Sequence, residues 1–490
     1  MEQLPALQVV LPLIAAPIIV LLRRAGIAWF IAVVVSWLSF AISVTLYIQV
    51  EQHGVISYAM GSWPAPWGIE YRVDALSAFM LVFVSGIAAV VAPYSLRSVA
   101  AEVAGEQLYL YYALFLLCLT GLLGIAITGD AFNLFVFLEI SSLSMYVLIA
   151  LGRQRRALLA SYQYLVMGTL GATFYIIGVG MLYLMTGTLN IADLAHRVPD
   201  LAATRPVYAA LAFITVGVSL KLALFPLHFW LPNAYAYAPS AVAAFIAATA
   251  TKVSVYVLLR FFFFVFGDVV ESEGPGIGGI LTMLAAVAIV SASLIACYQQ
   301  NLKRMFAFSS VAQIGYIILG ISFASIDGLT AAVVHIFNHG MTKGALFLLL
   351  GMVALRAGSV DIRAVAGLSR RMPLTCMGVV LAGLSLIGVP GTAGFVSKWY
   401  LVLAAIEKGS IWLVILIVGS SLIALVYVWR FVEAAYLREP TDATPREGEA
   451  PLSMLVPAWL LVAGCIWFGF DTSFNVGAAD AAARLMLGRP

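Results

Sequence analysis

Fourteen long apolar segments follow one another along this chain, and each has about the 20 residues that an α-helix needs to cross a bilayer. Hydrophobic residues make up 63% of the chain and charged residues only 10%, whereas roughly a quarter of a soluble domain is charged. The sequence therefore predicts an all-α membrane protein of about 14 transmembrane helices. No basic run precedes the first segment, so we expect it to be a retained helix and not a signal peptide. The segments are 4–22, 27–49, 73–95, 109–128, 131–151, 160–186, 207–231, 239–266, 277–299, 304–324, 328–355, 374–404, 411–436 and 452–470.

The sequence also argues against several classes of protein. A net charge of +3 is too small to indicate nucleic-acid binding. We find no phosphate-binding loop, dinucleotide fingerprint, nucleophile elbow or HExxH motif, so no enzyme active site is predicted. No acidic residue lies between His335 and His339, which argues against a metal pair there. The four cysteines have no CxxC spacing, so we expect no disulfide, metal site or cofactor; they are Cys118, Cys297, Cys376 and Cys465.

The positively charged residues predict the orientation in the membrane. The loops after odd-numbered segments carry fourteen Lys and Arg residues, and the opposite side carries six. Positive loops stay inside, so both termini are expected on the non-cytoplasmic side of a prokaryotic-type cell membrane. We interpret Arg260 and Arg430 as snorkelling side chains near helix ends, Asp74 as interfacial, and Lys303 with Arg304 as topology signals.

An internal repeat of about 170 residues covers five predicted helices. Gly171, Ala172, Phe174 and Gly178 align with Gly344, Ala345, Phe347 and Gly351. An odd number of helices places the two copies upside down relative to each other, as in secondary transporters. The predicted units are helices 1–3 (1–108), a first repeat (109–275), a second, inverted repeat (276–437), and a polar linker with helix 14 (438–490). A chance resemblance between glycine-rich helices is the alternative.

Each copy contains a predicted break in one helix. Pro226 interrupts the seventh segment, and Pro390 with Gly391 in "GVPGTAGF" interrupts the twelfth. Broken helices are tolerated in membranes only where the freed backbone is buried or lines a wet cavity. Lys221 precedes the first break and Lys398 follows the second, which predicts a polar pocket at each. The alternative is a proline kink with a lysine that reaches for the interface.

Other ionisable residues also lie within the predicted helices. They are Glu139, Lys252, His228, and the series His335, His339 and Lys343, whose spacing of four residues puts it on one helix face. Because burial disfavours the charged form, a lysine that loses a carboxylate partner can release a proton. We therefore predict a proton relay that begins with alternating pairing of Glu139 and Lys221 and uses the histidines as intermediates. Structural ion pairs and hydrogen-bonded core histidines are the alternative.

Five stretches of sequence carry a resemblance to a known family: "LEISSLSMY" (138–146), "KLALFPLHFWLPNAYAYAPSAVAAFIAATATKVSVYVLLR" (221–260), "NLKRMFAFSSVAQIGY" (301–316), "HIFNHGMTKGALFL" (335–348) and "GVPGTAGFVSKW" (388–399). They resemble the antiporter-like subunits shared by respiratory complex I, membrane-bound hydrogenases and Mrp-type sodium/proton antiporters. The resemblance implies fourteen helices with breaks in helices seven and twelve, two inverted five-helix repeats, and a hydrophilic axis at mid-membrane. By motif match it implies that Glu139 and Lys221 are the helix-five and helix-seven residues of the axis. It likewise implies that Lys252 links two half-channels and Lys398 is the exit residue.

Within the family the chain is most similar to D subunits of Mrp-type antiporters, because a lateral helix is absent and position 398 is lysine. The resemblance implies a proton-translocating subunit with other membrane subunits, protons, sodium and lipid as partners. A proton-pumping subunit of a complex I-like or hydrogenase complex, and a non-conducting structural subunit, are the alternatives. Asn233 and Tyr235 depart from the acidic residue and the histidine found after "WLP" in many relatives, which puts the proton path there in doubt.

Overall fold

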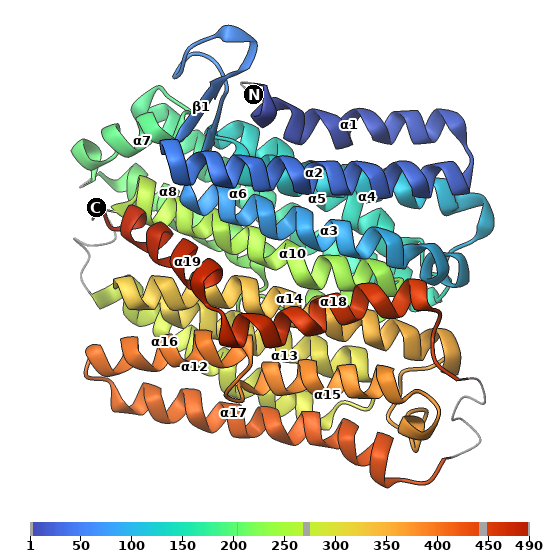
Figure 1. The fold of residues 1–490 in the computed structure, drawn as a ribbon. Helices are drawn as coiled ribbons and strands as arrows, with labels where there is room; N and C mark the ends of the chain where they lie inside the picture. Colours follow the sequence, from blue (N-terminus) through green and yellow to red (C-terminus); the bar gives the residue numbers. More distant parts are fainter. Residues whose placement is uncertain (1–2, 203, 268–274, 441–447, 489–490) are drawn as a thin grey trace.

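The helices lie side by side and run alternately in opposite directions through a single bundle (Figure 1). The computed structural model describes residues 3–202, 204–267, 275–440 and 448–488. Within these residues, thirteen helices are long and apolar enough to span a membrane. The predicted twelfth segment is divided into two shorter helices. Together these elements confirm the predicted fold class of about 14 crossings.

The helix bounds follow the predicted segments closely, with differences of a few residues at the ends. The long helices are α1 (Leu4–Leu22), α2 (Ala25–His53), α3 (Ala75–Glu102), α4 (Leu108–Ile127), α5 (Ala131–Ala150), α6 (Arg155–Thr186), α8 (Arg205–Leu222), α10 (Ser240–Leu259), α12 (Pro275–Tyr298), α13 (Leu302–Ser322), α14 (Ile326–Ala357), α17 (Ile411–Val432) and α18 (Leu452–Phe470). The shorter ones are α7 (Ile191–Arg197), α9 (Trp230–Tyr237), α15 (Pro373–Ile387), α16 (Ala393–Glu407) and α19 (Ser473–Met486). A π-helical segment, Arg260–Val265, extends α10.

Helices α10 and α14 form the centre of the bundle. Every residue of α10 is buried, and α14 is buried from Gly328 to Val353. The outer helices instead expose large apolar side chains: Met283 on α12 is 63% exposed and Ile415 on α17 is 67% exposed. An apolar outer surface around a core that holds the charged side chains is the arrangement expected in lipid.

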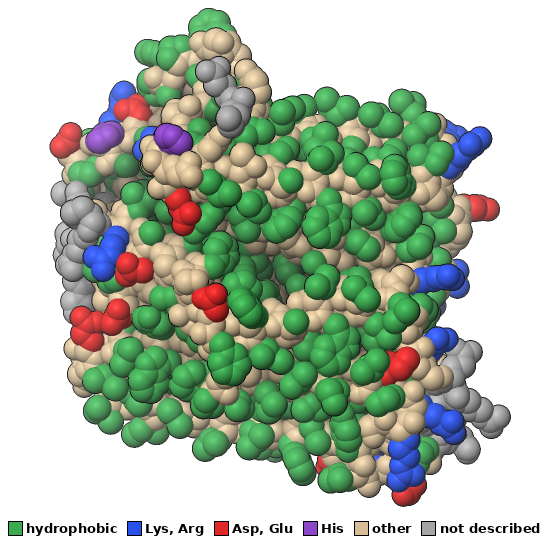
Figure 2. All heavy atoms as spheres, in the orientation of Figure 1, with side chains coloured by type: hydrophobic (Ala, Val, Ile, Leu, Met, Phe, Trp, Pro, Cys, Tyr) green, Lys and Arg blue, Asp and Glu red, His purple; other side chains and the backbone are tan. Residues whose placement is uncertain are grey.

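Polar groups gather at the two ends of the bundle, and the two ends differ. Figure 2 shows apolar side chains over the middle of the molecule, with most Lys and Arg at the end opposite both termini. We call this the basic end; it carries the loops α1–α2, α3–α4, α5–α6, α9–α10, α12–α13, α14–α15 and α17–α18. The other end carries a two-stranded antiparallel hairpin, β1 (Ile56–Ala59) and β2 (Glu70–Val73), which the sequence patterns did not predict.

Both predicted helix breaks are present. Helix α8 ends at Leu222 and α9 begins at Trp230; Pro226 lies in the turn between them. Helix α15 ends at Ile387 and α16 begins at Ala393, and Pro390 and Gly391 lie between. Left-handed residues end both half-helices: Ala223 (φ 60°) after α8 and Gly388 (φ 89°) after α15. The inverted relation of the two five-helix units stays a prediction.

The last crossing is also interrupted, which the sequence patterns did not predict. Helix α18 ends at Phe470 and α19 begins at Ser473. The Asn475 amide of α19 donates to the Asn338 side chain on α14 (3.2 Å), and Asn338 donates to the Ala393 carbonyl at the start of α16 (2.6 Å). The bend in the last crossing is therefore bonded to the second break. Residues 441–447 of the predicted polar linker lie outside the described residues.

Candidate ion-translocation site

An ion pair joins α5 to α8 beside the first helix break. The Lys221 ammonium lies 3.2 Å from a Glu139 carboxylate oxygen and donates to the Ser142 hydroxyl at 2.7 Å. The lysine side chain is 5% exposed and the glutamate side chain 23% exposed. Glu139 and Ser142 are three residues apart, so one face of α5 presents both acceptors to Lys221. The ammonium therefore has one charged and one neutral acceptor on the same face of α5.

A small cavity adjoins the inner side of this pair. It has a volume of about 10 Å³ and is lined by Lys221, Ser141, Tyr164 and Ser254 among others. That volume is close to the minimum for one water molecule, and three hydroxyl groups supply polar partners. Since Ser254 belongs to α10, the cavity joins the ion pair to the central helix.

Lys252 lies on α10, where its side chain is completely buried. Its ammonium donates to the carbonyl of Ala247 in the preceding turn. No carboxylate pairs with it among the described residues, in contrast to Lys221. Lys252 is close enough to interact electrostatically with both His335 and His339 of α14. Its neighbours on α10, Val253 and Ser254, line the small cavity beside Lys221.

The two histidines of α14 form a stacked pair. Their ring centroids are 5.7 Å apart with an interplanar angle of 13°. His335 has a partner on each ring nitrogen: Ser397 Oγ at Nδ1 (2.8 Å) and Gln313 Oε1 at Nε2 (2.9 Å). Neither ring nitrogen of His339 has a protein hydrogen-bond partner among the described residues, although both are buried. The pair thus joins one fully bonded ring to one ring whose nitrogens have no hydrogen-bond partner among the described residues.

Lys343, one turn further along α14, is fixed by α13. Its ammonium donates to the Phe306 carbonyl at 2.7 Å and to the Ser309 hydroxyl. His335 also bonds to α13, through Gln313. The predicted spacing along α14 therefore presents these polar side chains to one neighbouring helix.

The second break holds Lys398 by its backbone. The ammonium donates to the carbonyls of Ile387 (2.8 Å) and Leu386 (3.3 Å) and to the Ser421 hydroxyl (2.9 Å). Both carbonyls belong to the last turn of α15, where no intrahelical donor remains for them. The C-terminal end of a helix carries partial negative charge, so it stabilises a cation. The broken helix replaces the carboxylate that Lys398 lacks.

An aromatic ring connects Lys398 to the histidines. The ammonium lies 4.8 Å from the Tyr316 ring centroid, and that ring makes an edge contact with His335 at 5.8 Å. These side chains form a polar series across both halves of the protein: Glu139, Lys221, Lys252, His339, His335, Tyr316 and Lys398.

The geometry of the second break depends on a glycine. Gly388 has φ +89°, and a Cβ there would lie 2.9 Å from Lys398 Cδ. We expect Gly388→Ala to cost about 1–2 kcal/mol of stability, because left-handed backbone disfavours L side chains, and to displace the lysine. Unfolding in denaturant measures the first effect and proton flux the second.

Gly419→Ala is a matched control, since its Cβ would meet nothing within 4 Å on α17. Equal stability and flux in both variants would contradict the role given to Gly388.

His228 is placed differently from the prediction. It is buried in the turn of the first break, between the rings of Phe225 and Phe229 at 5.2 and 5.0 Å. No hydrogen bond joins it to Lys221 or Glu139 in the part of the chain that the structure describes. The other predicted ionisable residues belong to the polar series, except Lys343, which is held by α13. Sequence reasoning missed the hydroxyl and amide partners Ser142, Ser397, Ser421 and Gln313, although the first two lie within three residues of a predicted charge.

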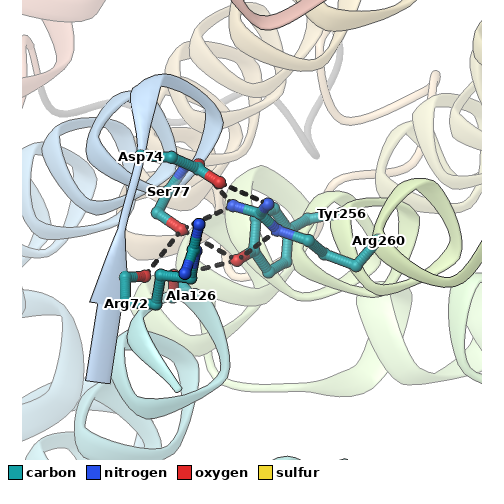
Figure 3. A network of polar contacts seen from close by, with 6 residues as sticks. All are labelled: Arg72, Asp74, Ser77, Ala126, Tyr256 and Arg260. Atoms are coloured by element: carbon teal, nitrogen blue, oxygen red, sulfur yellow. Dashed lines mark hydrogen bonds and ion pairs between the residues drawn. The ribbon is translucent and has the colours of Figure 1, made fainter. Parts of the chain in front are cut away.

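The interpretation of Arg260 as a snorkelling side chain was wrong, because Arg260 is buried in an ion pair with Asp74. Figure 3 shows the Arg260 guanidinium directed at the Asp74 carboxylate, with Ser77 and Tyr256 around it. The Arg260 side chain is 8% exposed and that of Asp74 3% exposed. Both terminal guanidinium nitrogens donate to the carboxylate. The Tyr256 hydroxyl donates to the Ala126 carbonyl at 3.0 Å. Since Asp74 also caps α3, the network fixes α3, α4 and α10 together near the end that carries the termini.

Lys303, which we interpreted as a topology signal, lies at the basic end, but its side chain is buried. It is 4% exposed and donates to the Ser240 hydroxyl at 2.8 Å. Arg430, by contrast, reaches carbonyls at the end of α12, including that of Gln299 (2.7 Å), as a side chain near a helix end can. Among the described residues no group of three His, Cys, Asp or Glu side chains could hold a metal ion.

Comparison with known proteins identifies the relatives of this arrangement. The family model described as "NADH:quinone oxidoreductase/Mrp antiporter, TM" matches residues 128–424, which include both helix breaks. The chain is 45% identical to the N subunit of the NADH-quinone oxidoreductase of Desulforudis audaxviator over 84% of each chain. It is 30% identical to the D subunit of a Na(+)/H(+) antiporter of Alkalihalophilus pseudofirmus, over 88% of this chain and 86% of the relative.

Solved structures of multisubunit membrane complexes contain the same fold. A chain of the archaeal membrane-bound sulfane sulfur reductase superposes with a TM-score of 0.91 at 31% identity, over 99% of this chain and 98% of that one. A chain of the Mrp complex from Dietzia sp. does so with a TM-score of 0.90 at 26% identity, over 99% and 97%. The chain belongs to the NADH:quinone oxidoreductase/Mrp antiporter family, as an antiporter-like membrane subunit of Mrp or complex I-like complexes.

Proposed function

We propose that this chain moves protons along its polar series as the D-type subunit of a multisubunit sodium/proton antiporter. The observation that carries the proposal is the Glu139–Lys221 pair beside the first helix break. Ionisable groups inside a membrane are costly, and they mark ion pathways by default. The residues proposed to carry protons are the members of the series other than Tyr316, together with Lys343 on α14: Glu139, Lys221, Lys252, His339, His335, Lys343 and Lys398.

The proposed relay depends on the alternation of partners around each lysine. While Glu139 is paired with Lys221, the ammonium is stabilised. When the carboxylate withdraws, Ser142 still accepts a hydrogen bond but supplies no charge, so the buried ammonium is disfavoured and releases its proton toward Ser254 and α10. Lys252 and the histidine pair take the proton onward. His228 is left outside this relay.

At the end of the polar series opposite Glu139, the backbone carbonyls at the end of α15 hold the Lys398 ammonium. Carbonyl oxygens only accept hydrogen bonds, so they bind Lys398 most strongly as an ammonium. We propose Lys398 as the last intramembrane carrier. We also propose that residues 109–275 and 276–437 are the two inverted units, each contributing one broken helix, with residues 1–108 and 438–490 packed around them.

The distribution of charge supports a defined orientation. We propose that the basic end faces the cytoplasm and that both termini lie on the opposite side of a prokaryotic cell membrane. The excess of Lys and Arg at one end is the basis, since such residues are retained inside.

A redox-driven complex is the second candidate. The 45% identity to a chain of an NADH-quinone oxidoreductase favours it, whereas the similarity to antiporter D subunits favours sodium coupling. The polar series is compatible with both, because proton transfer by this chain needs no cofactor of its own in either case.

Proton transport in everted vesicles that contain the whole native complex distinguishes the sodium/proton antiporter from the redox-driven complex. We expect added sodium to release protons from acidified vesicles, as followed with a pH-sensitive dye. Glu139→Gln should reduce this response at least about tenfold, because the amide keeps the hydrogen bond to Lys221 but removes its counter-charge. Glu407→Gln, at the exposed end of α16, is the matched control.

Assembly of each variant is checked on native gels. A wild-type complex that ignores sodium but acidifies vesicles on addition of an electron donor would support the redox-driven candidate. Normal flux in an assembled Glu139→Gln complex would contradict the relay itself.

A further inference from the structure

A cavity of about 810 Å³ opens at the basic end, between the two halves of the protein. Five segments line it: 101–102 at the end of α3, 152–156 at the start of α6, 236–239 between α9 and α10, 298–304 from the end of α12 to the start of α13, and 354–361 at the end of α14. No residue of the polar series lines it. It is therefore a separate site from the one described above.

Four basic side chains converge on this cavity, and none has an acidic partner within ion-pair distance among the described residues. Arg153 donates to the Val103 carbonyl (3.1 Å) and Arg156 to the Tyr237 hydroxyl (3.3 Å). Lys303 donates to the Ser240 hydroxyl, as noted above. The fourth, Arg304, has a buried Nε without a hydrogen-bond partner.

The two acidic side chains of the cavity accept hydrogen bonds from neutral groups, and Glu102 is also close enough to Lys303 to interact with its charge. Glu102 accepts hydrogen bonds from the Ser98 hydroxyl (2.9 Å) and the Ser240 backbone amide (2.8 Å). Asp361 accepts from the Asn301 side chain at 3.2 Å. The cavity thus has an excess of two positive charges and several donors that lack a charged acceptor.

The rim of the cavity reaches the apolar outer surface. Tyr298, which lines the cavity, ends α12 and is 81% exposed. The same helix exposes Met283, Val287 and Leu294, so its outer face is suited to lipid. A tyrosine at the end of such a helix is typical of the headgroup level of a bilayer.

From these contacts we infer that the cavity binds a phosphate group, carried by an anionic lipid headgroup or by a free phosphate ion. Arginine donors match phosphate oxygens in number and geometry, and basic pockets between transmembrane helices bind anionic headgroups. Retention of positive charge on one side of the membrane does not account for the site. A topology signal needs only solvent, whereas Lys303 is buried and the Arg304 Nε is enclosed without an acceptor.

The test uses the intact complex, purified in neutral detergent and depleted of lipid. Three probes are titrated separately: short-chain phosphatidylglycerol, phosphatidylcholine of equal chain length, and inorganic phosphate. Binding is followed by the thermal unfolding midpoint and by native mass spectrometry. We expect saturable binding of phosphatidylglycerol that is about tenfold weaker in Arg304→Gln and about 30-fold weaker in the double variant Arg156→Gln/Arg304→Gln.

Arg304→Gln is the decisive single variant, because the Arg304 side chain makes no hydrogen bond within the described residues that the change would remove. If the double variant fails to assemble, Arg156→Lys/Arg304→Gln replaces it. Because lysine keeps the positive charge at position 156, this variant should bind phosphatidylglycerol about as well as Arg304→Gln alone. Arg370→Gln removes an exposed, ion-paired charge from the same end of the protein and should leave binding unchanged.

The three probes distinguish the sources of the phosphate. Phosphatidylglycerol binding without phosphate binding supports a lipid headgroup, and binding of both with the same dependence on Arg304 supports free phosphate as well. Equal affinity in wild type and Arg304→Gln, or no binding because an acidic segment of another protein in the complex fills the cavity, would overturn the inference.

Discussion

Lys221→Arg is expected to abolish proton flux in a complex that still assembles. The guanidinium keeps the positive charge that pairs with Glu139, but arginine does not give up its proton in proteins. A relay through position 221 therefore stops, with a loss of at least about tenfold in flux. A purely structural ion pair would tolerate the change. The measurement is dye-monitored proton movement in vesicles, normalised to the amount of assembled complex.

Lys408→Arg is the matched control for this substitution. Lys408 is exposed after α16 and bonds the Ser322 carbonyl at 3.4 Å, outside the polar series. Flux should be unchanged there. If Lys221→Arg transported protons as fast as wild type, position 221 would have no proton-carrying role and the proposed relay would fail.

Arg260→Met is expected to have the largest effect on stability. It leaves the Asp74 carboxylate buried without its cation, and loss of one partner of a buried ion pair costs about 3–5 kcal/mol. The pair fixes α3 to α10 (Figure 3), so we expect weak assembly and a lower unfolding free energy in detergent. The double variant Asp74→Asn/Arg260→Met should recover part of the loss, because no unpaired charge remains and Asn can still cap α3.

Arg484→Met provides the comparison on the surface. Arg484 pairs with Asp480 at 2.7 Å on α19, but both side chains are well exposed, so the cost should stay below about 1 kcal/mol. Similar costs for Arg260→Met and Arg484→Met would mean that the Asp74–Arg260 pair is screened by water and does not fix the two helices.

Local composition was enough to predict the helices and both breaks. Runs of about 20 apolar residues have one stable form in lipid, and Pro226 and Pro390 lie in the turns that follow α8 and α15. The spacing of His335, His339 and Lys343 predicted one polar face correctly. These features depend on residues close together in the sequence, so the chain itself carries the signal.

Contacts between distant segments were not predictable in the same way. Asp74 and Arg260 are 186 residues apart, and each alone resembles an interfacial charge. The bend between α18 and α19 follows an apolar run with no proline at the bend, and it is bonded to α14 through Asn475 and Asn338. His228 shares the first break with Lys221, but the turn directs its ring between two phenylalanines. In each case, contacts with other parts of the chain determine where the residue or bend lies.

The position of Lys398 within the membrane exposes its charge to part of the transmembrane potential. Its ammonium is held by the end of α15, about 22 Å along the helix from Pro373 at the basic end. A unit charge that crosses the whole membrane changes its energy by about 2.3 kcal/mol per 100 mV. In the proposed relay, a proton that stops at Lys398 has crossed only part of that field. Voltage would therefore set how often this lysine is charged, and a change in potential would shift the occupancy of the site before any ion concentration changed.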